Sequence, residues 1–171
     1  MIVPKFFKSF VYFTFALLVF MLTHNGAALP AKVLPTDTCS LLPPGELQKV
    51  LEQHFGAPQR STAPAAYPGL PSGTECDYMA QNGLTRKVVF IFYADPSAAG
   101  AKETFGKLSM WFAPKSRPSG IGDAAYIDGD HAIHVLKGKV RYYINIIPIG
   151  TITPQKEKQL RDLAVSVAAR I

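Results

Sequence analysis

The spacing of apolar positions predicts three amphipathic helices. The first follows Pro44 and keeps a helical period over about twelve residues, ending at Gly56. Its inner face comprises Leu47, Val50, Leu51, His54 and Phe55. The second begins at Asp95-Pro96, a capping residue followed by a proline suited to the first helical position, and runs to about Phe112. Its inner stripe comprises Ala98, Ala101, Phe105, Leu108 and Phe112, with Trp111 at the edge. The third begins at Thr153-Pro154, and its stripe comprises Leu160, Leu163, Ala164, Val167, Ala168 and Ile171.

Between these helices, shorter apolar runs predict strands. Residues 76–80 alternate and lead through Gln81-Asn82-Gly83, a hairpin signal, into residues 86–94. Residues 86–94 are apolar on both faces, which is typical of a central strand. Three short strands follow, and their tight connections require antiparallel pairing; they span residues 124–128, 131–136 and 140–147.

These elements predict an α+β fold, in the order α-β-β-α-β-β-β-α. Three helices are expected to pack on a mainly antiparallel sheet of about five strands. Residues 57–74 hold four prolines and two glycines and are expected to form a loop. Residues 29–38 are expected to form an extended tether, and residues 39–171 a single domain.

The pattern of residues 1–28 is that of a cleaved signal peptide. Lys5 and Lys8 form a short positive start, and an uncharged run of 15 residues follows at 9–23. A membrane-spanning helix needs about 20 apolar residues, whereas the apolar region of a signal peptide needs only about 7–15. Small residues precede a cleavage site after Ala28. We therefore expect export, to the periplasm or otherwise into the medium; a retained N-terminal anchor is the alternative.

Composition and charge then narrow the possible partners. The net charge of +6 falls to +4 when the two lysines of the signal are removed, and the basic residues are scattered along the chain. Binding to nucleic acid requires a cluster of Lys and Arg, so no nucleic-acid partner is expected. Contact with a membrane is expected only through an uncleaved signal. The two cysteines of an exported chain favour a disulfide between Cys39 and Cys76 over a metal pair or a reactive thiol.

The residue types that carry catalysis or bind metals do not converge in the sequence. His54 lies on the apolar side of the first helix, whereas His131 and His134 are three apart on a strand and point to opposite faces. Asp128 and Asp130 are interpreted as hairpin-turn residues, because the distal Glu of a calcium loop is missing. Neither a G-x-S-x-G motif nor a spare thiol is present. The sequence therefore predicts no catalytic residue, metal or cofactor.

One glycine pair has a structural interpretation. Gly120-Ile121-Gly122-Asp123 resembles a phosphate-binding loop, but it precedes a strand, and a helix N-terminus is needed to bind an anion. We expect Gly120, Gly122 and Asp123 to form a turn that directs the backbone into the sheet, with the Asp123 side chain closing it by a hydrogen bond.

Several short motifs together resemble a family of small exported bacterial proteins, many of them lipoproteins with domains of unknown function. The motifs are Cys39-Ser40-Leu41-Leu42, Cys76-Asp77-Tyr78 and Gly120-Ile121-Gly122-Asp123-Ala124-Ala125-Tyr126. The resemblance spans most of residues 37–171 and implies export, a Cys39–Cys76 bridge and a compact α+β domain. It implies no catalytic residue. The residues before Cys39 are not a lipobox, which sets this chain apart from the lipoprotein members.

The function expected from these features is non-catalytic binding of a protein or an envelope component. The expected surface is one face of the sheet or the loop at 57–74. The alternatives are an inhibitor of an extracellular hydrolase and a small enzyme. Interface hot spots favour exposed aromatic side chains, and the candidate partner-binding residues are therefore Tyr67, Tyr78 and Trp111.

Overall fold

The computed structural model describes residues 34–66, 68–81, 86–130, 132–148 and 153–171. The predicted signal peptide, the first part of the tether, Tyr67, His131 and the turn at 82–85 lie outside these residues. The elements in chain order are the 3-10 helix η1 (Thr38–Leu41), α2 (Pro44–Leu51), β1 (Gln59–Ala63), β2 (Gly73–Met79), β3 (Lys87–Ala94), α3 (Ala98–Trp111), β4 (Ala124–Ile127), β5 (Ala132–Lys137), β6 (Val140–Ile147) and α4 (Pro154–Arg170).

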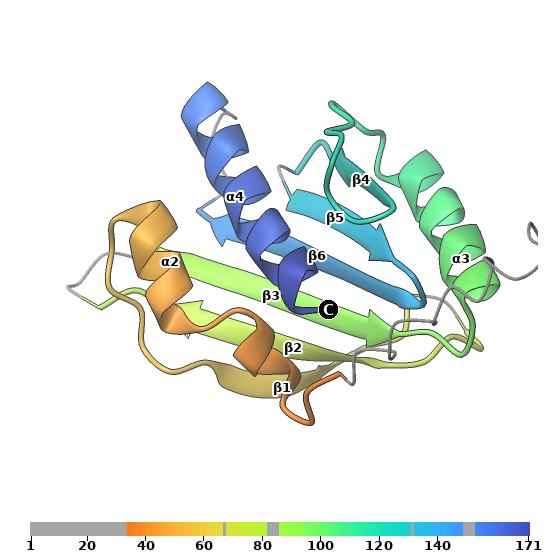
Figure 1. Cartoon of the computed structure of the whole chain (residues 1–171), viewed down its shortest axis with the longest axis horizontal. Helices are drawn as coiled ribbons and strands as arrows, with labels where there is room; N and C mark the ends of the chain where they lie inside the picture. The colour runs from red at the N-terminus through yellow and green to blue at the C-terminus, as the bar shows by residue number, and fades with distance from the viewer. Residues whose placement is uncertain (1–33, 67, 82–85, 131, 149–152) are drawn as a thin grey trace, which may run out of the picture. The chain divides into compact units, whose positions relative to one another are not determined.

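The α+β fold class is confirmed, with one more strand than expected. The sheet has six strands in the order β1-β2-β3-β6-β5-β4, and all neighbours pair antiparallel (Figure 1). The sixth strand is β1, which lies inside the segment expected to be a loop. β1 is an edge strand, and four of its five residues are exposed. It therefore carries no apolar alternation from which it could be predicted.

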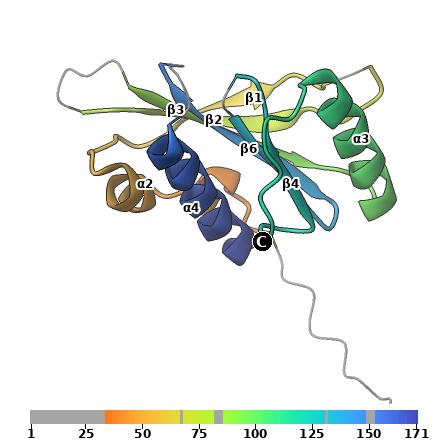
Figure 2. The ribbon, with the colours of Figure 1, turned by 90° about the horizontal axis from the view of Figure 1, so that it is seen from above.

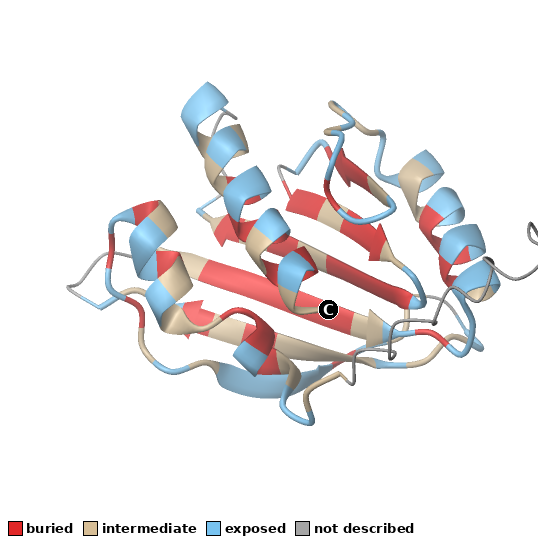
Figure 3. Ribbon diagram, in the orientation of Figure 1, coloured by how far each residue is buried: buried red, intermediate tan, exposed pale blue. Residues whose placement is uncertain are grey.

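One face of the sheet is covered by η1, α2 and α4, which lie together on the same side in Figures 1 and 2. The N-terminus of α4 is as predicted: Thr153 accepts a hydrogen bond from the Lys156 amide at 3.1 Å, and Pro154 follows it. The first five of the six residues of its predicted stripe are buried in the main core, and Ile171 packs against that core partly buried. Figure 3 shows the burial along each element in the same orientation. The predicted strand 86–94 is β3, which is central in the sheet.

The first helix is shorter than predicted. α2 ends at Leu51 because Glu52 adopts a left-handed conformation, with a φ of 54°. Phe55 then forms an isolated antiparallel bridge with Ala80, just after β2. Its side chain is buried as predicted, but it belongs to an extended segment and not to the helix. His54 is exposed and is not a helix-boundary residue.

The middle helix, α3, packs on the opposite face of the sheet, against Tyr126 and Leu136. Its cap differs from the prediction: the Ser97 hydroxyl, not Asp95, accepts from the Gly100 amide at 3.1 Å. Within the predicted stripe Ala101 and Phe105 are buried, whereas Ala98 and Phe112 are exposed. α3 therefore leaves part of this face open beside its C-terminal end.

The disulfide between Cys39 and Cys76 is confirmed, and it ties η1 to β2. The Tyr78 hydroxyl donates a buried hydrogen bond to the Cys39 carbonyl at 3.0 Å. Burial raises the pKa of Tyr78, so this hydroxyl remains a donor at neutral pH. Within the described residues, no helix is both long enough and apolar enough to span a membrane.

Candidate functional site

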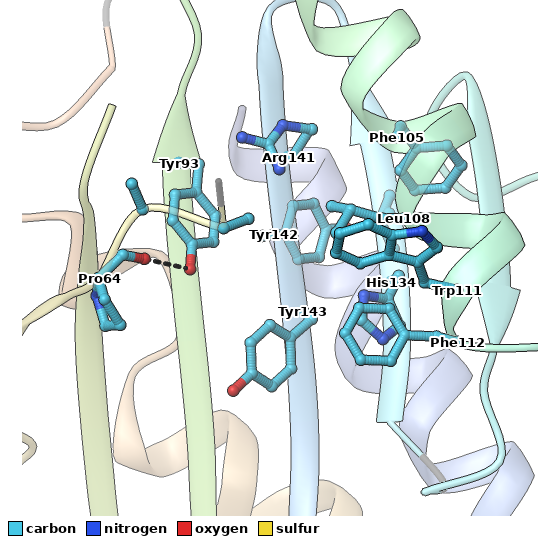
Figure 4. A pocket seen from close by; sticks show the side chains of 13 residues that line it. Pro64, Tyr93, Phe105, Leu108, Trp111, Phe112, His134, Arg141, Tyr142 and Tyr143 are labelled. Carbon is cyan, nitrogen blue, oxygen red and sulfur yellow. Dashed lines mark hydrogen bonds between the residues drawn. The ribbon is translucent and has the colours of Figure 1, made fainter. Parts of the chain in front are cut away.

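A groove of about 230 Å³ opens between α3 and the exposed part of the sheet (Figure 4). Its sides come from segments that are far apart in the sequence. Pro64–Ala66, after β1, form one wall together with Tyr93 of β3; the C-terminal half of α3 forms the other. β5 and β6 supply the floor. The aromatic and histidine side chains of this groove are Tyr93, Phe105, Trp111, Phe112, His134, Tyr142 and Tyr143.

A stack of rings crosses the sheet beside the groove. Tyr126, His134 and Tyr143 are directly opposite one another on β4, β5 and β6, so their side chains share a face. The ring centroids of Tyr126 and His134 lie 4.5 Å apart, and those of His134 and Tyr143 lie 5.4 Å apart. Phe112 stacks on His134 from the end of α3, at 5.4 Å. The neighbouring strands thus hold the rings in fixed positions.

His134 is held by a buried carboxylate. Its Nε2 lies 2.7 Å from Asp128 Oδ2, and Asp128 Oδ1 accepts from the Ala132 amide at 2.9 Å. An ionised carboxylate only accepts hydrogen bonds, so Nε2 of His134 carries the proton. Burial acts to raise the pKa of Asp128, but the hydrogen bonds from His134 and Ala132 outweigh it and lower that pKa. Asp128 thereby fixes the orientation of the histidine ring.

Arg141, the other basic side chain that lines the groove, is also paired with a carboxylate of the fold. Arg141 donates to Asp95 from Nε at 2.5 Å and from a terminal nitrogen at 3.0 Å, and both side chains are buried. The guanidinium lies over the Tyr93 ring, 4.9 Å from its centroid. Arg141 and His134 are therefore both paired with carboxylates of the same chain. Among the described lining residues, the groove presents rings and no unpaired charge.

The outer rim of the groove is apolar and exposed. Trp111 is 68% exposed, Met110 is 74% exposed and Phe112 is 40% exposed at the C-terminal end of α3. Trp111 also lines a second depression, of about 390 Å³, together with Pro68, Leu70 and Met110. Clusters of exposed apolar side chains mark interaction surfaces on soluble domains.

The structure places the three candidate partner-binding residues differently. Trp111 lies on the groove. The expectation for Tyr78 is wrong: its side chain is 0% exposed on the inner face of β2, so it cannot contact a partner. Tyr67 lies outside the described residues.

The remaining candidate residues are structural. Gly120 and Gly122 both have positive φ, and a Cβ at Gly122 would lie 2.4 Å from the Leu136 carbonyl oxygen. Asp123 does bond through its side chain, but to the Gly138 amide in the next hairpin turn, at 2.6 Å. Asp130 is an exposed turn residue. Within the described segments, no three His, Cys, Asp or Glu side chains gather in an arrangement suited to a metal ion.

Sequence reasoning missed the pairing of Asp128 with His134 and of Asp95 with Arg141. Asp128 precedes a glycine and matches a turn residue, and Asp95 precedes a proline and matches a helix cap. The alternation of β5 and β6 does carry a signal, because His134, Arg141 and Tyr143 occupy positions of one face. That alternation shows which sheet face these side chains share, but it does not show that Asp128 and Asp95 pair with them.

The Asp128–His134 contact predicts a pH-dependent stability. Because its pKa is lowered in the folded chain, the carboxylate stabilises the fold above its unfolded pKa of about 3.9, and this contribution is lost as the pH falls through the folded value. Asp128→Asn should lower the free energy of unfolding by about 1.5–3 kcal/mol at pH 7. The difference from wild type should shrink toward pH 3. Urea unfolding at several pH values measures it, and a difference independent of pH would contradict the assignment.

Comparison with known proteins adds no relative. Neither the scan against protein-family models nor the search of curated proteins found a match to this chain.

Proposed function

We propose that the chain is an exported, non-catalytic domain that binds an apolar segment of an envelope protein in the groove beside α3. The observation that carries this proposal is the exposure of Trp111 and Phe112 beside a ring-lined groove. Exposed aromatic side chains are the residues that most often dominate the energy of protein interfaces. The proposed binding surface therefore includes part of one sheet face and residues 64–66 of the segment 57–74, the two surfaces expected from the sequence.

The size of the groove supports a macromolecular partner. Pockets that enclose whole small molecules have volumes of about 300–1,000 Å³, and the groove, at about 230 Å³, is smaller. It has room for a few side chains of a larger ligand. Arg141 is paired with Asp95 and His134 with Asp128, so neither side chain offers a free charge to an ionic ligand.

Export is part of the same proposal. The disulfide agrees with an oxidising compartment, and the signal-like residues 1–28 supply the route. We propose the periplasm as the location, with secretion into the medium as the alternative. Membership of the family of small exported bacterial proteins is likewise proposed on the motifs quoted above.

The test compares two variants of the full chain, exported by a bacterial host, in pull-downs from the envelope fraction of the source cell. Trp111→Ala should reduce the amount of bound partner at least about tenfold, because hot-spot truncations cost about 2 kcal/mol or more. The fold should be unaffected, since Trp111 is exposed.

The matched control is Val165→Ala. Val165 is 47% exposed on α4, which packs on the other face of the sheet. This variant should retain the partner as wild type does. Equal retention by both variants, or loss from both, would place the binding surface elsewhere and refute the proposal.

A further inference from the structure

We propose that the partner segment is proline-rich and binds the groove as a polyproline II helix. This inference rests on the proposed function and names the chemistry of its ligand. Polyproline II segments dock in grooves lined by aromatic side chains, and their low conformational entropy before binding favours association. The groove combines three features that suit such a ligand: the arrangement of its rings, its paired basic side chains, and tyrosine hydroxyls placed to donate to backbone carbonyls.

The rings of the groove form separate walls with a gap between them. Tyr93 stands on one side, and Trp111 and Phe112 stand on the other (Figure 4). The rigid sheet holds Tyr93 and Tyr143, on the neighbouring strands β3 and β6. Prolyl rings are compact and apolar, and a prolyl residue has no backbone N–H to donate. Prolyl rings therefore suit the gap between these aromatic side chains, because the gap is lined by few polar groups.

The charge of the groove argues against other ligands. An acidic or basic peptide would need an opposite charge, whereas Arg141 and His134 are already paired with Asp95 and Asp128. A sugar would stack on the rings but also needs several polar partners for its hydroxyls. A polyproline II segment needs only occasional donors to its carbonyl oxygens.

One hydrogen bond at the wall of the groove shows a tyrosine of the groove donating to a backbone carbonyl. The Tyr93 hydroxyl donates a hydrogen bond to the Pro64 carbonyl at 3.1 Å, and Pro64 lies on the wall of the groove. Glycine at position 73 keeps space for the Tyr93 ring, because a Cβ there would lie 2.8 Å from two ring carbons. Tyrosine thus binds the carbonyl of a prolyl residue at one edge of the groove.

Tyr143 supplies the matching donor for a bound segment. Among the described residues its hydroxyl makes no hydrogen bond, and its ring lines the groove. Burial, reinforced by the charge of Glu75, raises the pKa of Tyr143 to about 12. The hydroxyl therefore stays protonated and able to donate throughout the physiological range.

A labelled synthetic peptide of five Ala-Pro repeats tests the inference with the full exported chain. Trp111 is the single tryptophan of the protein, so its fluorescence reports directly on the groove. Binding of the peptide should shift the Trp111 emission to shorter wavelength. The fluorescence anisotropy of the labelled peptide should rise to saturation as the protein concentration increases. Trp111→Ala should weaken binding at least about tenfold, and Tyr143→Phe by about twofold to tenfold, the value of one hydrogen bond. Val165→Ala should bind as wild type does.

A peptide of five Ala-Gly repeats is the control for backbone length. Equal binding of both peptides, or binding of the Ala-Pro peptide that is insensitive to Trp111→Ala, would overturn the inference. Failure of the Ala-Pro peptide to bind, while retention of the envelope partner still depends on Trp111, would overturn it and leave the proposed function standing. Absence of both effects would refute the two together.

Discussion

Arg141→Met should lower the free energy of unfolding by about 3–5 kcal/mol, because it leaves the buried Asp95 carboxylate without its partner. The two side chains are 4% and 1% exposed, and they meet through two hydrogen bonds. Methionine keeps most of the length and volume of the arginine stem, so the loss measures the unpaired charge. Urea unfolding at pH 7, followed by circular dichroism, provides the measurement.

The double variant Asp95→Asn, Arg141→Met is the control for this prediction. Removal of both charges should recover most of the stability, since a buried pair is often close to neutral when it is replaced as a whole. A loss below about 1 kcal/mol for Arg141→Met would show that water reaches Asp95 and that the groove wall is open. A double variant as unstable as the single one would mean that packing around Arg141, and not its charge, holds β6 to β3.

Replacement of Cys39 and Cys76 by alanine should cost about 4 kcal/mol, because the bridge closes a long loop in the unfolded chain. The two cysteines are separated by 37 positions in the sequence. Both lie in the main core, so alanine also removes some buried sulfur contacts. Thermal or urea unfolding of the double variant, compared with wild type, gives the difference.

Two comparisons identify the cause of that loss. Reduction of the wild-type protein with dithiothreitol should bring its stability close to that of the double variant. Tyr78→Phe, which removes only the hydrogen bond to the Cys39 carbonyl, should cost about 1 kcal/mol. A double variant that loses less than Tyr78→Phe would contradict a stabilising role for the bridge.

The sequence predicts those helices and strands whose apolar positions follow directly from which of their faces are buried. α4 has the predicted capping threonine and N-terminal proline, and five of the six residues of its predicted stripe are buried in the core. β3 is apolar after Lys87, and its residues 88–92 are buried on both faces of the sheet. β1 carries no such pattern, since four of its five side chains are exposed. The end of α2 is also unmarked, because it depends on the pairing of Phe55 with a distant strand.

The groove could not be predicted for a different physical reason. Its residues come from five separate segments, and only the order of strands in the sheet brings them together. Trp111 could be predicted as an exposed candidate from its position at the edge of the helical stripe. Asp95 and Asp128 could not, because each precedes a residue typical of a cap or a turn. Their inward orientation follows from the register of β6 with β3 and of β5 with β4.

The central claim is that the partner binds in the groove beside α3. Site-specific photo-crosslinking in the source cell tests it most directly, with benzoylphenylalanine placed at position 112, on the groove, or at position 165, on α4. We expect an adduct of one defined mass from position 112, suppressed by Trp111→Ala, and none from position 165. Adducts of the same mass from both positions, or from position 165 alone, would contradict it.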